Sequence, residues 1–290
     1  MNRDPLARTL LNVYLGLFLV YLFLPLIIMA AATFNDSRFP TITPWQGYTL
    51  KWFGQLWADT QMWTALTTSL LIGVGVVALA VPVGLAAALL LTALQRRART
   101  FVYAVMVSPL LTPGVIIGIS TLIFWRETLG LSGGVLLTIL AQSTFITGYV
   151  MLMVTAHLER FDRTLEEAAL DLGATHVQVF RRITLPYLAP ALLAAAFLAF
   201  LQSFENYNTT LFVRGLDTTL TIYIASKVRT GVTPAVNALG LILIGLTILG
   251  AIVYELRRRR LERRRRVQAA RATEADRAIL ATEAALIEGR

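Results

Sequence analysis

The chain has 290 residues, 56% of them hydrophobic, and a formal net charge of +9. Its mean hydropathy of +0.66 is too high for a soluble globular protein of this length. The absence of cysteine excludes disulfides, thiolate catalysis and cysteine-based metal sites, and the two histidines, His157 and His176, find no carboxylates at ligand spacing. Most arginines flank long apolar runs, so the positive charge indicates membrane topology and not a nucleic-acid partner.

Six apolar stretches are long enough to cross a bilayer, which takes about 20 helical residues. They cover residues 10–33, 65–94, 101–125, 131–156, 190–213 and 235–254. The apolar part of the first stretch is longer than that of a cleaved signal peptide, so we expect it to remain as a helix. The sequence therefore predicts an all-α polytopic membrane protein with six transmembrane helices.

The distribution of basic residues predicts the orientation. Twenty of the 26 lysines and arginines lie in the N-terminal residues, in the loops after the second and fourth spans, and in the tail. Because basic residues accumulate on the cytoplasmic side, both termini are expected there. We expect a cytoplasmic N-terminus at residues 1–9, a transmembrane domain at 10–256 and an arginine-rich cytoplasmic tail at 257–290.

The loop at residues 34–62 is expected outside and is rich in Phe, Trp and Tyr. An interfacial belt that anchors the fold is favoured, and a docking surface for an extracytoplasmic partner is the alternative. The fourth span carries a polar stripe that includes Gln142, Ser143 and Thr147, which we expect to bond to a neighbouring helix.

The cytoplasmic loop at residues 157–189 contains a spaced motif. Glu-Ala-Ala is followed by three residues, a glycine, nine residues and Ile-x-Leu-Pro; the fixed positions are Glu167, Ala168, Ala169, Gly173, Ile183, Leu185 and Pro186. Thr164 and Glu167 stand at capping-box spacing, which predicts a helix that starts at Leu165 and ends near Gly173. Thr175 and Gln178 repeat the spacing and predict a second helix from His176 to about Arg182.

The fifth predicted span is interrupted by polar residues. A carboxylate near the middle of a span is costly unless it faces a polar interior. On a continuous helix, Glu205, Asn208 and Thr209 would share one face, so we expect this segment to line a translocation path. A buried interhelical cluster, with the helix ending early, is the alternative. The candidate pathway residues are Phe204, Glu205, Asn206, Tyr207, Asn208 and Thr209.

Eight arginines fall within residues 257–266. Such a cluster beside a span attracts anionic lipid headgroups. A stop-transfer signal followed by a solvated tail explains it almost as well.

The Glu-Ala-Ala motif resembles the cytoplasmic coupling loop, or EAA loop, of the permease subunits of type I ABC importers. The resemblance extends over residues 65–254. The fifth-span run and the later Ile222-Tyr223, residues 231–234 and residues 237–239 are most similar to the second permease subunit of spermidine/putrescine importers. Relatives that import ferric iron or aminoethylphosphonate share the framework and stay as alternatives. An ion-coupled secondary transporter, the alternative from another class, would need no EAA loop.

The resemblance implies an inner-membrane complex with a second permease chain, expected to differ from this one, a dimer of ATPase subunits and an extracytoplasmic solute-binding protein. In that reading Ala168 and Ala169 permit close approach to a groove of the ATPase. Glu167 holds the fold of the loop through its cap, and Gly173 supplies the turn between the two helices. The residues that fix the loop to the start of the fifth span are Ile183, Leu185 and Pro186. A P-loop needs a lysine after a glycine-rich turn, and Lys51 and Lys227, the chain's lysines, lack one. We therefore expect a non-catalytic subunit without a cofactor, with ATP and Mg on the partner ATPase.

Overall fold

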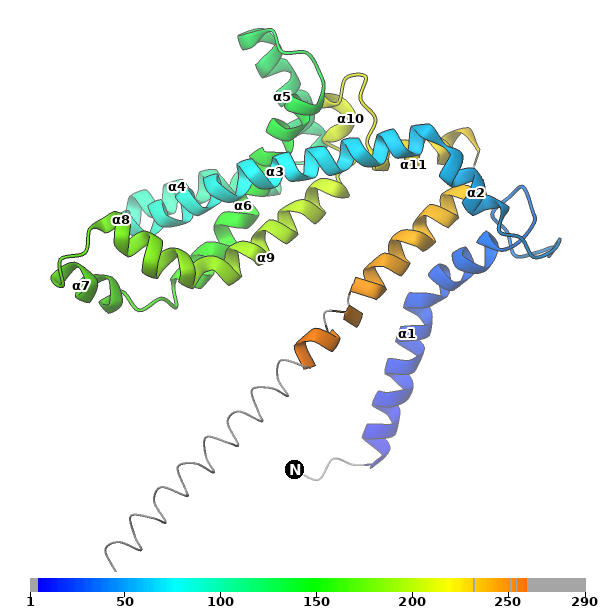
Figure 1. The fold of residues 1–290 in the computed structure, drawn as a ribbon, viewed down its shortest axis with the longest axis horizontal. Coiled ribbons are helices and arrows are strands. Elements are labelled where there is room, and N and C mark those ends of the chain that lie inside the picture. Colours follow the sequence, from blue (N-terminus) through cyan, green and yellow to red (C-terminus); the bar gives the residue numbers. More distant parts are fainter. Residues whose placement is uncertain (1–4, 232, 251, 254, 260–290) are drawn as a thin grey trace, which may run out of the picture. The chain divides into compact units, whose positions relative to one another are not determined.

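The computed structural model describes residues 5–231, 233–250, 252–253 and 255–259 (Figure 1). Apart from turns, loops and one isolated bridge between Asn35 and Tyr48, these residues are helical. The elements are α1 (Pro5–Thr33), α2 (Lys51–Ala58), α3 (Thr60–Ala93), α4 (Arg96–Leu111), α5 (Gly114–Leu129), α6 (Val135–Leu158), α7 (Thr164–Asp171), α8 (His176–Val179), the π-helix η1 (Phe180–Thr184), α9 (Leu185–Phe204), α10 (Thr210–Val213) and α11 (Leu220–Thr230). A further helix covers residues 234–250.

The described residues contain five helices long and apolar enough to cross a membrane, and α4 with α5 makes a sixth span if that bent pair counts as one. The predicted all-α architecture of six apolar spans is confirmed in this form. The chain divides into two compact units, residues 57–232 and residues 1–56 with 233–290.

In the unit of residues 57–232, α3, α6 and α9 lie side by side (Figure 1). These helices are apolar around most of their circumference, as expected where lipid replaces water and every backbone group must bond within its helix. Their shared core includes Val76, Ile146, Met151 and Leu188. At Gly84 a Cβ would stand 2.6 Å from the Val150 Cβ, so only glycine allows this close approach of α3 to α6.

The third predicted span is bent. α4 ends at Leu111, α5 begins at Gly114, and the two helices meet at 106°. Pro113 explains the break, because the residue before a proline is driven out of the helical region; Thr112 has φ −88° and ψ 131°. The single apolar stretch expected over residues 101–125 therefore corresponds to two helices.

The fifth predicted span, residues 190–213, was wrong at both ends. The helix is continuous from His176 through η1 and α9 to Phe204, and Glu205 is its C-cap residue. Residues 205–209 form a break before the short α10. The faces expected of a continuous helix at Glu205, Asn208 and Thr209 therefore do not exist. The early end of the helix, which was part of the alternative, is confirmed, whereas Glu205 and Asn208 are exposed and do not belong to a buried cluster.

In the other unit, the loop after α1 is organised around Asn35, which is fully buried. Its amide nitrogen donates to the Thr41 carbonyl at 2.8 Å, and its amide oxygen accepts from the Gln46 backbone at 2.8 Å. The Trp52 indole donates to the Asn35 carbonyl at 2.9 Å, which ties α2 to the loop. Much of the predicted external loop, residues 34–62, is thus a folded structure. Four of its aromatic side chains, those of Phe39, Trp45, Tyr48 and Trp57, are exposed.

Candidate functional site

The EAA loop folds as a helix–turn–helix at one end of the α3, α6 and α9 bundle (Figure 1). Thr175 caps α8 as predicted: its hydroxyl accepts from the Gln178 amide at 3.3 Å, and the Gln178 side chain accepts from the Thr175 amide at 2.8 Å. The capping box predicted for Thr164 and Glu167 was wrong, because α7 begins at Thr164 itself.

Asp162 bonds to the first residue of α7, whose N-cap residue is Arg163. Its carboxylate accepts from the hydroxyl of Thr164 at 2.8 Å and from the backbone amide of Thr164 at 3.0 Å, and these bonds lower the pKa of Asp162. The Glu167 side chain is exposed and caps nothing. Because carboxylates in a first helical turn favour the positive end of the helix dipole, Glu166 and Glu167 still suit their positions in α7.

Gly173 ends the first helix, as predicted. Its φ of +86° lies in the left-handed region, where a residue with a Cβ is strained. The neighbouring surface is apolar and uncovered: Leu165, Ala168 and Leu172 are exposed, and Leu172 retains 89% of its accessible area. An exposed apolar helix of this kind is the form that docks into a groove on another protein.

The second half of the EAA loop is continuous with the long apolar helix α9. A helix ending at Arg182 was a wrong prediction, because α8 passes through η1 into α9. The hydroxyl of buried Thr184 donates to the Glu166 carboxylate, which fixes α7 to this continuous helix. Sequence reasoning missed this pair, since nothing in the motif spacing indicates which of two adjacent glutamates turns inward. Ile183 and Leu185 are half-buried beside it.

The candidate pathway residues lie at the opposite end of the same bundle, in the break between α9 and α10 (Figure 1). Glu205 and Asn208 are exposed, Phe204 and Tyr207 are half-buried, and Thr209 is buried. Asn206 has a structural role: its side-chain oxygen accepts from the backbone amides of Thr209 and Thr210, both at 3.2 Å. The break therefore begins as an Asn-capped turn into α10.

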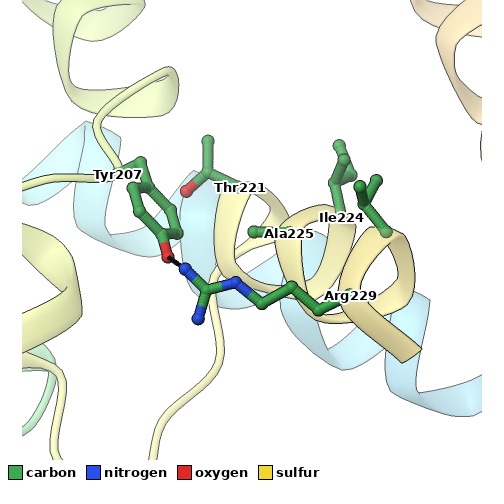
Figure 2. Close-up of a pocket in the computed structure, with 6 residues that line it drawn as sticks. Tyr207, Thr221, Ile224, Ala225 and Arg229 are labelled. Carbon is green, nitrogen blue, oxygen red and sulfur yellow. Dashed lines mark hydrogen bonds between the residues drawn. The ribbon is translucent and has the colours of Figure 1, made fainter. Parts of the chain in front are cut away.

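A shallow hollow of about 410 Å³ adjoins this break (Figure 2). It is lined by Tyr207, Thr221, Ile224, Ala225, Val228 and Arg229. Figure 2 shows the Arg229 guanidinium directed at the Tyr207 hydroxyl, to which Nη2 donates at 3.1 Å. The wall is largely aliphatic, with polar groups at one side. Arg229, on α11, was not among the predicted site residues.

An ionic cluster holds α11 to the start of α3. The Tyr223 hydroxyl donates to Asp59 Oδ2 at 2.8 Å, and Lys227 Nζ lies 3.3 Å from the same oxygen. Partial burial raises the pKa of Asp59, but hydrogen bonds from Tyr223 and the Met62 amide, with the charge of Lys227, outweigh it and lower the pKa overall. Burial and the bond to Asp59 raise the pKa of Tyr223.

Metal binding has no evident site in the part of the chain that the structure describes. No three histidine, aspartate or glutamate side chains gather there in an arrangement that could hold an ion.

A bundle of apolar helices with an exposed helix–turn–helix at one end and a polar break at the other is the architecture of a transporter's transmembrane subunit. The chain belongs to the family of binding-protein-dependent transport system inner membrane components, whose sequence pattern matches residues 80–267. It is a permease subunit of an ABC importer and resides in the inner membrane, and the permease subunits of this family are non-catalytic.

Two curated relatives match almost the whole chain. The putrescine transport system permease protein PotI of Escherichia coli (strain K12) is 35% identical over 268 residues, which cover 89% of this chain and 95% of PotI. The spermidine/putrescine transport system permease protein PotC of the same strain is 32% identical over 255 residues, covering 88% and 96%.

Solved structures show the same fold. A chain of a bacterial alginate ABC transporter, solved in complex with an alginate pentasaccharide-bound periplasmic protein, superposes with a TM-score of 0.66. It is 18% identical, and the match covers 87% of this chain and 93% of that one. At this identity the likeness supports the type I permease fold alone.

Proposed function

We propose that this permease subunit imports polyamines of the spermidine and putrescine class. The observation that carries the proposal is the similarity to PotI and PotC over almost 90% of the chain. Relatives within the wider family that carry ferric iron or aminoethylphosphonate supply the alternative solutes. The geometry at the break after α9 favours a cation among these.

Glu205, Tyr207 and Asn208 would contact the solute, and Phe204, Asn206 and Thr209 would shape the break that presents them. A carboxylate beside an aromatic ring attracts an ammonium group through charge and cation–π contact. The aliphatic wall of the hollow at Ile224, Ala225 and Val228 suits the methylene spacers of a polyamine. The positive charge of Arg229 would repel a second ammonium group of the polyamine and so weaken its contact with the hollow. Weak binding of this kind is what a path needs in order to release its cargo.

Coupling would run through the EAA loop. The exposed surface of Leu165, Ala168 and Leu172 would sit in a groove of the partner ATPase, where ATP and Mg bind. Because α7 is bonded to the continuous η1–α9 helix through Glu166 and Thr184, a shift of α7 would move α9 and the break at its far end. Rigid-body motion of this kind is a common basis of alternating access.

The remaining assignments follow from the arginine distribution. The termini and residues 157–189 would face the cytoplasm, and residues 34–62 would face an extracytoplasmic solute-binding protein and the lipid interface. Residues 10–256 would be the transmembrane domain, paired with a second, different permease chain. Residues 1–4 of the N-terminal segment 1–9 and residues 260–290 of the arginine-rich tail lie outside the described residues.

Glu205→Gln tests the solute class. The change keeps the side-chain volume and an acceptor oxygen but removes the charge, so uptake of labelled spermidine and putrescine by the complete transporter should fall about tenfold or more. ATP hydrolysis and thermal stability of the complex should persist. Glu127→Gln, which neutralises an exposed carboxylate on α5, is the matched control and should leave uptake unchanged. Unchanged uptake by Glu205→Gln would remove the case for a cationic solute.

A further inference from the structure

The break between α9 and α10 is short and polar, yet its two ends are tied to one residue of α6. Gln142 is 1% exposed, and Thr210 is fully buried. The Ser203 hydroxyl, in the last turn of α9, donates to Gln142 Oε1 at 2.5 Å. Gln142 Nε2 donates to the hydroxyl of Thr210, the first residue of α10, at 2.8 Å. Gln142 thus bridges the two helix ends.

The chain of hydrogen bonds continues into the break. The Thr210 hydroxyl donates to Asn206 Oδ1 at 3.1 Å, the atom that also accepts from the Thr209 and Thr210 amides. Every donor in the series Ser203, Gln142, Thr210 and Asn206 therefore points the same way. Hydrogen bonds between buried neutral groups favour one arrangement, because each lost bond leaves an unpaired polar group.

We propose that Gln142 is a positioning residue for the translocation path. By fixing the end of α9 and the start of α10 relative to α6, it determines where the exposed side chains of Glu205 and Asn208 project. This inference rests on the proposed role of residues 204–209 in transport. It assigns to α6 a function in the path that does not require contact with the solute.

Four variants distinguish the effect of losing these hydrogen bonds from the effect of changing the volume of the side chains. Gln142→Leu removes the bonds to Ser203 and Thr210. Thr210→Val removes the two bonds of the Thr210 hydroxyl, to Gln142 and to Asn206, with little change of shape. Thr210→Ser keeps the hydroxyl and should restore normal behaviour. Ser143→Ala is the matched control on the same helix: Ser143 is buried, and its hydroxyl has no hydrogen-bond partner among the described residues. Uptake should fall about tenfold in the first two variants and stay normal in the last two.

A readout of position, and not of stability, comes from cysteine labelling in the assembled transporter. Since the chain has no cysteine, Asn208→Cys supplies its sole thiol. The rate of labelling by a water-soluble methanethiosulfonate should change about fivefold or more when Gln142→Leu or Thr210→Val is added. A second reporter, Leu216→Cys, should change less than about twofold, because Leu216 is fully exposed and makes no bond in the network.

Labelling at position 208 that Gln142→Leu and Thr210→Val leave unchanged would overturn the proposal, even if stability fell. Equal changes at positions 208 and 216 would also overturn it, since the network would then serve general packing. The outcome does not depend on the solute. If Glu205→Gln transports normally, the polyamine assignment fails, while labelling at position 208 still decides the role of Gln142.

Discussion

Gly173 forms the turn between α7 and α8 of the EAA loop, and its backbone conformation disfavours any residue that has a Cβ atom. Its φ of +86° favours glycine, and a Cβ built there would meet nothing within 4 Å. Gly173→Ala therefore adds backbone strain of about 1–2 kcal/mol without any clash. We expect the turn between α7 and α8 to shift, and solute-stimulated ATP hydrolysis and uptake to fall several-fold while the chain still inserts. Gly173→Val, which adds more bulk, should abolish both.

Gly130 offers a matched control for that strain. It has φ +65°, a Cβ added to it would likewise meet nothing within 4 Å, and it caps α5 away from the EAA loop. Gly130→Ala should cost similar stability in a thermal unfolding assay and leave coupling intact. Equal loss of coupling in the two variants would mean that general destabilisation, and not the EAA turn, controls ATP hydrolysis.

The contact of α11 with α3 contains two titratable groups whose pKa values are shifted, so its stability depends on pH. The pKa of Asp59 is lowered in the folded state, so its contribution to stability is present above its unfolded value of about 4 and is lost as pH falls through the folded value. The pKa of Tyr223 is raised, so its contribution is present below about 10 and is lost as pH rises further. Stability from this cluster is greatest between these limits.

Asp59→Asn tests this contact. The variant keeps the shape but removes the charge that Lys227 and Tyr223 stabilise, so the thermal midpoint should fall at pH 7 and depend less on pH below 4. Asp36→Asn, which removes an exposed carboxylate paired with Lys51, is the control and should change the midpoint little. If the thermal midpoint of Asp59→Asn depends on pH below 4 as strongly as that of the unchanged protein, the pH dependence belongs to other groups.

The elements also show which features a sequence can predict. The number of apolar spans, with the bent pair counted as one, and the Thr175 cap depend on local composition and spacing, and both were predicted correctly. The end of α9 was missed because Leu211, Phe212 and Val213 extend the apolar run past a break made by the Asn206 side chain. Hydropathy alone could not give the 106° angle at Pro113, because it measures composition and not the direction of the chain. The bonding of Gln142 to a neighbouring helix was predicted from the polar stripe and is confirmed. The identity of its partners and the inward turn of Glu166 depend on contacts with distant segments, which spacing cannot supply.

At the scale of the whole molecule, the two candidate sites lie at opposite ends of one bundle, α3, α6 and α9 (Figure 1). If this bundle crosses the membrane, the EAA loop and the break after α9 face opposite compartments. Leu172 and Leu216 mark these two ends and are 89% and 100% exposed. The arginine distribution predicts which end of the bundle faces the cytoplasm. The loop that contains Leu172 also contains Arg160, Arg163 and two further arginines, so it belongs to the more basic, cytoplasmic side.

Single-cysteine labelling tests this orientation directly. In the cysteine-free chain, expressed without its ATPase so that docking cannot cover the loop, Leu216→Cys should react with a membrane-impermeant thiol reagent added to intact spheroplasts. Leu172→Cys should react only after permeabilisation or in inverted vesicles. Both are leucines replaced at exposed positions, so each serves as the control for the other. The reverse pattern would place the EAA loop outside, where no ATP is available, and would refute its proposed coupling to an ATPase.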